Sequence, residues 1–164
     1  MVKVPLPANI SPRHAGIVAI AVALAAPMEG LRQYAYYDPP GVLTVCYGHT
    51  GNVQKGRLYS KAECEALLGQ DMLSAVQTVD RCVPGLPWKT AAAWADAVFN
   101  LGPTIVCNTE RSTAARLLKA GRLQEACMQL PRWAFARVGG QPVKLPGLVK
   151  RRELERQLCL EGLT

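Results

Sequence analysis

Six cysteines lie in a chain of only 164 residues, and they restrict its possible folds more than any other feature. They are Cys46, Cys64, Cys82, Cys107, Cys127 and Cys159. An even number of widely spaced cysteines in a small domain is typical of a disulfide framework. No pair has the spacing of a zinc knuckle, and Cys46 with His49 is an isolated pair, so we expect no metal. Metal ligation and free buried thiols are the alternatives, and the spacing does not choose among the fifteen possible disulfide connectivities.

The N-terminal segment has the pattern of an export signal, which a protein with disulfides needs to reach an oxidising compartment. Residues 15–28 carry no charge and follow Lys3 and Arg13. This apolar run is too short and too weakly hydrophobic for an ordinary membrane span. The tripeptide Ala23-Leu24-Ala25 resembles a signal-peptide cleavage site. A buried first helix of a soluble domain explains the segment equally well.

The composition predicts one globular domain, because 49% of the residues are hydrophobic and only 19% are charged. A capping box at Ser60–Glu63 precedes apolar residues at three- and four-residue intervals, which predicts a helix that ends near Arg81. Stop signals such as Gly121 and Pro131 delimit the later helices. We expect these helices over residues 90–101, around 114–118, over 122–130 and over 148–160.

Two segments with strand patterns, QYAYYD and VLTVCYG, flank Pro39-Pro40-Gly41 and predict a β-hairpin. We expect everything beyond this hairpin to be helical, with the Gly/Pro-rich residues 139–147 as a mobile linker. The predicted fold class is therefore α+β and mainly α, with a small β-hairpin lobe joined to a helical lobe.

Glu29, Asp38 and Thr44 fall at the end of the first helix, the close of the first strand and the second strand. Two carboxylates across a cleft are what glycoside hydrolysis requires. Glu29 follows Pro27 and Met28, and apolar surroundings favour the protonated form that a general acid needs. On spacing alone, a helix end and a turn residue are the simpler interpretation of the two carboxylates.

An ordered set of motifs runs through residues 29–160. EGLRQYAYYDPPGVLT contains Glu29, Asp38 and Thr44, and Gly48-His49 follows. The later motifs are SKAECEALLGQD, AVFNLG, RLLKAGRLQEACMQLPRW and GLVKRRELE. Together they resemble the phage-type lysozymes, the endolysins and muramidases of glycoside hydrolase family twenty-four. The resemblance implies a lysozyme-like two-lobe fold, with a catalytic domain at residues 29–164.

The activity that this resemblance implies is hydrolysis of the β-1,4 bond between N-acetylmuramic acid and N-acetylglucosamine in peptidoglycan, which lyses the host cell. Glu29 would be the general acid, while Asp38 and Thr44 would position the attacking water and the anomeric centre would be inverted. The enzyme would act as a monomer without a cofactor.

Further roles are implied for residues around the cleft. His49 would form a structural ion pair with Asp71 between the lobes. Arg151 or Arg152 would reach Glu29, and the resemblance does not decide which. The residues implied to contact the glycan are Thr50, Phe99 and Gln129, together with the neighbouring Asn100. The implied disulfide pairs are Cys46–Cys64, Cys82–Cys107 and Cys127–Cys159.

Residues 1–28 are similar to the signal-arrest-release segments of some endolysins, because they are weakly hydrophobic, rich in small residues and adjacent to Glu29. The similarity implies an inactive form tethered to the host inner membrane through residues 15–28, and then an active form released into the periplasm. The segment contains no cysteine, so membrane release rather than thiol exchange would activate the enzyme.

The formal charge is +7, from 19 Lys+Arg and 12 Asp+Glu, and suits the anionic surroundings of peptidoglycan. The most basic stretch contains Lys144, Lys150, Arg151, Arg152 and Arg156, in part as a solvated helix face. No stacking motif or zinc finger indicates a nucleic-acid partner. The alternatives are a lytic transglycosylase, a cationic membrane-disrupting protein without catalysis, and a Cys-His hydrolase. The transglycosylase would not need the water that Asp38 and Thr44 would position, and the hydrolase lacks a third orienting residue.

Overall fold

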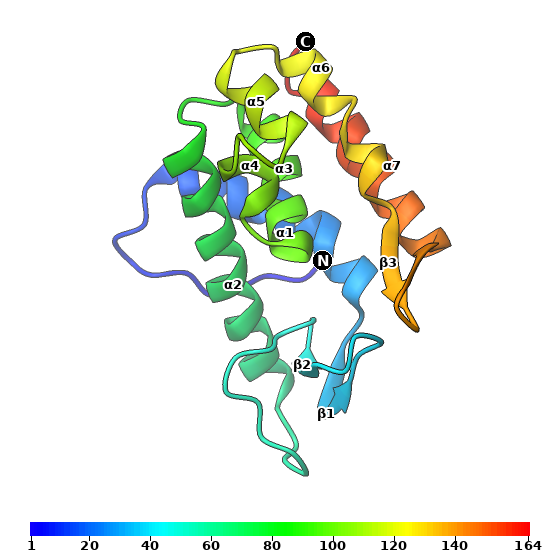
Figure 1. Ribbon diagram of the computed structural model, residues 1–164. Helices are drawn as coiled ribbons and strands as arrows, with labels where there is room; N and C mark the ends of the chain where they lie inside the picture. The colour runs from blue at the N-terminus through cyan, green and yellow to red at the C-terminus, as the bar shows by residue number, and fades with distance from the viewer.

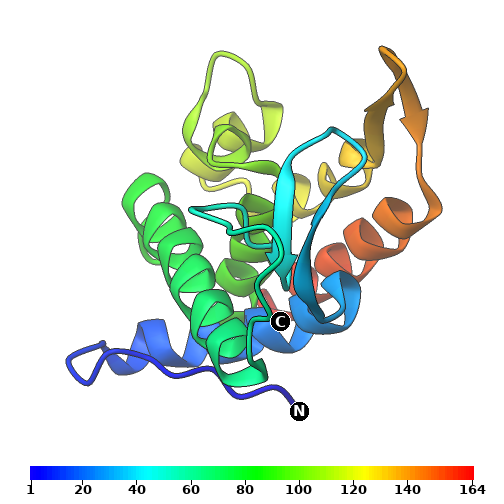
Figure 2. The same cartoon turned by 90° about the horizontal axis from the view of Figure 1, so that it is seen from below.

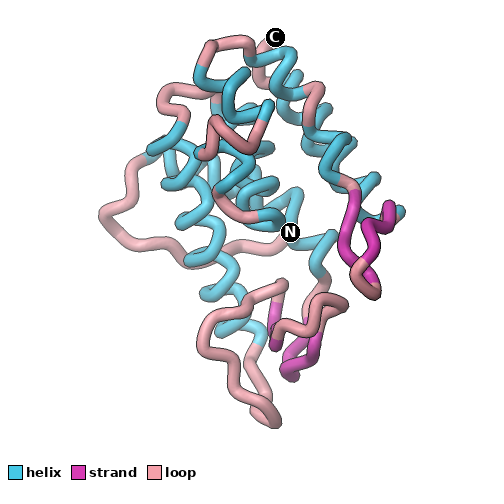
Figure 3. Tube along the Cα trace, in the orientation of Figure 1, coloured by secondary structure: helices cyan, strands magenta, loops and turns pink.

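The computed structural model describes residues 1–164 as helices with two small β-hairpins (Figures 1 and 3). The helices are α1 (Pro12–Glu29), α2 (Lys61–Cys82), α3 (Trp88–Leu101), α4 (Thr104–Cys107), α5 (Thr113–Lys119), α6 (Leu123–Cys127) and α7 (Pro146–Glu161), with a 3-10 turn η1 (Leu130–Trp133). The strands are β1 (Arg32–Tyr37), β2 (Leu43–Cys46), β3 (Phe135–Val138) and β4 (Gln141–Lys144). The predicted mainly helical α+β class is confirmed.

Two lobes are joined along α2. The antiparallel strands β1 and β2 and the loop that follows them lie at one end of α2, and the other helices gather at its opposite end (Figure 1). Within this hairpin, Tyr36 is paired with Thr44 and Tyr37 with Leu43. Figure 2 shows the same hairpin standing between α2 and α7. This arrangement brings the end of α1 and the start of β1 to the junction of the lobes.

Helices α1 and α3 form the centre of the hydrophobic core. Ser11 caps α1 by accepting a hydrogen bond from the His14 amide at 3.1 Å. The buried side of α1 consists of small aliphatic residues: Ile17, Val18, Ala21, Val22, Ala25 and Ala26. Close packing extends to Gly16, where a Cβ atom would lie 2.2 Å from the ring of Trp88. No helix combines the length and apolar character that crossing a membrane requires.

The long helices follow the predicted boundaries closely, and one short helix does not. The capping box of α2 is present at Ser60 and Glu63, and α2 ends one residue beyond Arg81. The helix predicted over residues 122–130 is wrong at its C-terminal end, because α6 stops at Cys127. The chain then forms η1, which includes Pro131 near its start, where a missing amide costs no helical hydrogen bond.

The prediction that only helices follow the first hairpin is wrong, and part of the expected linker over residues 139–147 is a strand. The strands β3 and β4 form a second antiparallel hairpin, in which Phe135 is paired with Lys144 and Val138 with Gln141. Gly139 and Gly140 have φ angles of +57° and +79°, as a two-residue hairpin turn requires. The Gly-Gly pair was therefore the signal of a hairpin turn.

Three disulfides connect separate elements of the fold. Cys46–Cys64 joins β2 to α2, Cys82–Cys107 joins the end of α2 to α4, and Cys127–Cys159 joins α6 to α7. These are the pairs that the family resemblance implies. No cysteine is left free. The zinc-site and free-thiol alternatives are therefore wrong for this structure.

Candidate active site

Glu29 is the last residue of α1, at the point where the chain leaves the helical lobe. The helix ends because Gly30 has a φ of +70°, while its amide still donates to the Ala26 carbonyl at 3.1 Å. The Glu29 side chain is 19% exposed. It packs on Gly48, where a Cβ atom would lie 2.8 Å from Glu29 Oε2. Gly48 also has a φ of +78°, so both the close approach and the backbone angle favour glycine.

Arg151 holds Glu29 from α7. Its Nη1 atom donates to Glu29 Oε1, while Nε and Nη2 donate to the two carboxylate oxygens of Asp96 at 2.9 and 2.7 Å. Burial disfavours the charge of Arg151, but the hydrogen bonds and charges of Asp96 and Glu29 outweigh burial and raise the pKa of Arg151. Of the two candidate arginines, Arg151 is thus the one that contacts Glu29.

Asp38 and Thr44 are joined through the turn of the first hairpin. Asp38 Oδ1 accepts from the Val42 amide at 2.7 Å, and the Thr44 hydroxyl donates to the Val42 carbonyl at 2.9 Å. Neither side chain is hydrogen-bonded to Glu29. Burial raises the pKa of the Tyr36 phenol, the charges of Glu29 and Asp38 raise it further, and Arg32 opposes them. Along the chain, Glu29 precedes β1 and Asp38 follows it.

A cavity of about 470 Å³ lies between the lobes. Gly48 and Thr50 line it from the β-hairpin lobe, and Phe99 lines it from α3. Asn100 accepts a hydrogen bond from Arg152 at 3.0 Å and is not among the lining residues. Gln129 lies elsewhere, in a surface cavity of about 570 Å³ beside α6, where it accepts from Arg132 at 2.9 Å. The structure thus brings two of the four expected glycan contacts into this cavity.

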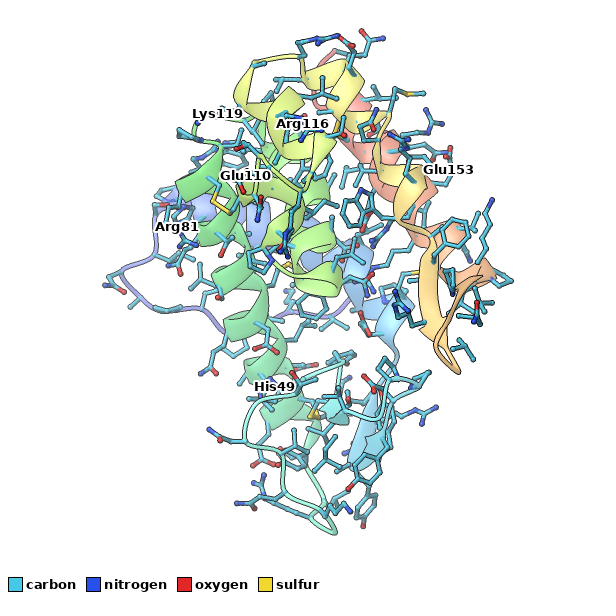
Figure 4. The ribbon with its side chains drawn as sticks, in the orientation of Figure 1. His49, Arg81, Glu110, Arg116, Lys119 and Glu153 are labelled. Atoms are coloured by element: carbon cyan, nitrogen blue, oxygen red, sulfur yellow. A yellow bond between two sulfur atoms is a disulfide. The ribbon has the colours of Figure 1, made fainter.

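His49 connects the loop after β2 to α2. Its Nδ1 lies 2.7 Å from Asp71 Oδ2, and its Nε2 lies 2.7 Å from the Gly51 carbonyl oxygen. Both neighbours are acceptors, so both contacts are hydrogen bonds only when both ring nitrogens carry protons. Figure 4 shows His49 at the lower end of α2, beside the first hairpin. The contact therefore has the geometry of an ion pair between the lobes.

Comparisons with known proteins agree with this geometry. Residues 26–155 match the family model described as phage lysozyme. The chain belongs to the phage lysozyme family. The SAR-endolysin of bacteriophage PS119 is 40% identical over 155 residues, which cover 90% of this chain and 89% of that relative. The SAR-endolysin of Enterobacteria phage P21 is 37% identical over 155 residues, covering 90% of both chains.

A solved structure shows the same arrangement of elements. The active form of P1 phage endolysin Lyz superposes with a TM-score of 0.74 at 25% identity, covering 96% of this chain and 98% of that one. The protein is accordingly an endolysin-type lysozyme, an enzyme that degrades peptidoglycan.

Two charged residues of this phage lysozyme, Asp96 and Glu155, were missed by the sequence analysis. Both are fully buried. Burial, followed by the hydrogen bond and charge of Asp96, raises the pKa of Glu155 well above its usual range. Burial also opposes the charge of Asp96, but the contact with Arg151 outweighs it and lowers the pKa of Asp96. The sequence could have indicated Asp96, because it is the only charged residue within the apolar run Ala91–Phe99.

Proposed function

We propose that this phage lysozyme hydrolyses the β-1,4 bond between N-acetylmuramic acid and N-acetylglucosamine, with Glu29 as the general acid. The observation that carries this proposal is the position of Glu29 at the junction of the lobes, held by Arg151 and packed on the cavity-lining Gly48. A partly buried carboxyl group beside a cleft is suited to protonating a leaving oxygen.

The proposed reaction needs one proton donor and one water. Glu29 gives its proton to the glycosidic oxygen as the bond from that oxygen to the anomeric carbon breaks. A water molecule attacks the anomeric carbon from the opposite face and loses a proton to Asp38, so that the configuration is inverted. Thr44 contributes by accepting from this water, since its own proton is directed to the Val42 carbonyl. Both side chains are hydrogen-bonded to the Val42 backbone, so the turn fixes their positions relative to each other.

Substrate contacts are proposed on both sides of the cavity. Thr50 offers a hydroxyl from the first lobe, and Phe99 offers an apolar face beneath the sugar rings. Asn100 and Gln129 are proposed as more distant contacts. Asn100 accepts a hydrogen bond from Arg152, and Gln129 lies beside α6. The glycan would thus follow the junction of the lobes. The enzyme is proposed to act as a monomer.

The N-terminal segment is proposed to tether the enzyme to the host inner membrane before release into the periplasm. Residues 15–28 form most of α1, which ends at Glu29. While these residues lie in a bilayer, Glu29 cannot reach Arg151 or Gly48, so the tethered enzyme would be inactive. The SAR-endolysins that are similar to this chain support the proposal.

The activity is tested by Glu29→Gln, which keeps the shape of the side chain and removes its acid. We expect a loss of about a thousandfold in lysis of bacterial cells with permeabilised outer membranes. Glu161→Gln is the matched control, because Glu161 is an exposed carboxylate paired with Lys89 at the end of α7. Mass spectrometry should detect hydrated reducing ends. Anhydro products would indicate a transglycosylase, and equal lysis by Glu29→Gln would indicate membrane disruption.

The tether is tested by adding charge to the exposed side of α1. Ala19 and Ala23 are exposed in the folded enzyme, so lysines there should leave the activity of the purified enzyme intact. In a bilayer each lysine costs about 3 kcal/mol, so Ala19→Lys/Ala23→Lys should fail to associate with membranes in expressing cells. Ala19→Ser/Ala23→Ser is the control. Equal membrane association of the lysine and serine variants would contradict the tether.

A further inference from the structure

A network of buried charged side chains lies behind Glu29. Arg151 contacts Glu29 and Asp96, and Arg152 donates to Glu155 Oε1 at 2.6 Å and to Asn100 at 3.0 Å. The side chains of Asp96, Arg152 and Glu155 are 0% exposed and that of Arg151 is 5% exposed. Buried ion pairs are costly because of desolvation, so they are poor devices for stability alone. Because this network contacts Glu29 through Arg151, its position indicates a role in the reaction.

Asp96 determines how Arg151 is oriented. The two Asp96 oxygens take the Nε and Nη2 edge of the guanidinium, which leaves Nη1 for Glu29. A planar guanidinium held by two parallel hydrogen bonds has a fixed orientation. Asp96 is itself immobilised in the buried stretch of α3 that runs from Thr90 to Val98. The position of the atom that holds Glu29 is therefore set from α3.

The charge of Asp96 also matters for Glu29. A cation in contact with a carboxyl group favours the ionised form, which cannot act as a general acid. Asp96 supplies a negative charge on the opposite edge of the same guanidinium. On the β-hairpin side, Tyr36 of β1 lies within reach of the charges of Glu29, Asp38 and Arg32. Glu155 Oε1 lies 3.9 Å from Arg151 Nε, whereas Asp96 accepts two hydrogen bonds from the same guanidinium, so Asp96 is the buried carboxylate that offsets the charge of Arg151.

We propose that Asp96 is a positioning residue for the reaction, which orients Arg151 onto Glu29 and balances its charge so that Glu29 keeps its proton. The proposal rests on the proposed function of Glu29 as the general acid. Asp96 does not touch substrate and acts through Arg151. Glu155 and its partner Arg152 continue the same network toward Asn100.

The test is the pH dependence of kcat/KM for Asp96→Asn, measured on solubilised glycan strands. Without the negative charge, Arg151 should favour ionisation of Glu29, and the alkaline limb of the profile should move to lower pH by about one unit. We expect kcat to fall about tenfold at neutral pH, with little change in KM. Glu153→Gln is the control: Glu153 also belongs to α7, but it is paired with Arg156 on the outer side of the helix (Figure 4).

An unshifted alkaline limb in folded Asp96→Asn would overturn the proposal, because loss of a merely structural group lowers the melting temperature without moving that limb. In Glu155→Gln the limb should move less than in Asp96→Asn, since Glu155 lies 3.9 Å from Arg151 while Asp96 accepts two hydrogen bonds from it. An equal shift would contradict the assignment of the charge to Asp96. Glu29→Gln separates the two proposals: if it remains active, the proposed function fails, whatever Asp96→Asn does.

A measurement on the unmodified enzyme applies even where Asp96→Asn does not fold. Carbon-13 NMR of the side-chain carboxyl groups should show Asp96 ionised at neutral pH. A protonated Asp96 would overturn the proposal, because Asp96 would then carry no charge to set against Arg151. The two measurements test the charge and its effect on the reaction separately.

Discussion

Helices α1 and α7 both lie against the core and meet at one ion pair, but they are held by opposite means. α1 buries small aliphatic residues and contains no cysteine. α7 buries Arg151, Arg152, Glu155 and Cys159, and a disulfide ties it to α6. Hydrophobic burial has no preferred direction, whereas buried ion pairs and disulfides require fixed geometry.

This difference separates two functions within the site. The proposed acid, Glu29, comes from the helix whose buried side is made of small aliphatic residues. The group that holds it, Arg151, comes from the helix that is anchored covalently and by charge. Under the proposed tether, α7 could keep Arg151 bound to Asp96 while α1 and Glu29 lie in the membrane. Four variants test this comparison.

Arg151→Met should have the largest effect on stability, because it leaves Asp96 buried without its partner. We expect a loss of about 3–5 kcal/mol in the free energy of unfolding, measured by urea titration at neutral pH. Lys150→Met is the control, since the neighbouring Lys150 is exposed. A loss below about 1 kcal/mol would mean that the ionic anchor of α7 is weak.

Replacing Cys127 and Cys159 together by alanine should cost about 4 kcal/mol, from the loop of 32 residues that the disulfide closes. Unfolding in urea is again the measurement. Removal of the Cys82–Cys107 disulfide, whose cysteines are 25 residues apart, should lower the free energy of unfolding by nearly as much. Removal of Cys127–Cys159 should loosen α7 in hydrogen exchange, whereas removal of Cys82–Cys107 should not.

Ile17→Val should cost only about 1 kcal/mol, because it removes one buried methylene from α1. The same change at Ile20, which is half-buried, should cost less and serves as the control. A greater loss at Ile17 than from the Cys127–Cys159 disulfide would reverse the comparison and make α1 the more firmly held helix.

Asp80→Asn should have the smallest effect. Asp80, on α2, accepts from Arg13 at 2.8 and 3.1 Å and lies 2.8 Å from His14 Nε2, which fixes the start of α1. The loss should be below about 1 kcal/mol because the cluster is partly exposed.

The effect of Asp80 should also depend on pH. The hydrogen bond from Arg13 outweighs burial and lowers the pKa of Asp80. The stabilisation is thus complete above the unfolded value of about 3.9 and is lost as the pH falls through the lower folded value. Thermal melts of wild type and Asp80→Asn should converge in acid. A difference that persists at low pH would assign the effect to packing.

Local patterns in the sequence predicted much of the fold. The capping box, the apolar periodicity and the turn prolines specified α2 and the first hairpin, because each acts between residues close in the chain. The second hairpin was missed because a Gly-Gly turn between short exposed strands has the same composition as a linker. The positions of Glu29, Asp38 and Thr44 followed from a motif of fixed spacing.

The surroundings of that motif depended on contacts between distant residues. Arg151 and Arg152 are neighbours in sequence, and both are buried, but only Arg151 contacts Glu29 because successive residues of a helix point about 100° apart. Asp96 is 55 residues from Arg151. The sequence by itself determined the proposed acid Glu29, the turn residues of the first hairpin and the six cysteines. Only the packing of α1, α3 and α7 decided which groups surround Glu29, because burial and charge act through space.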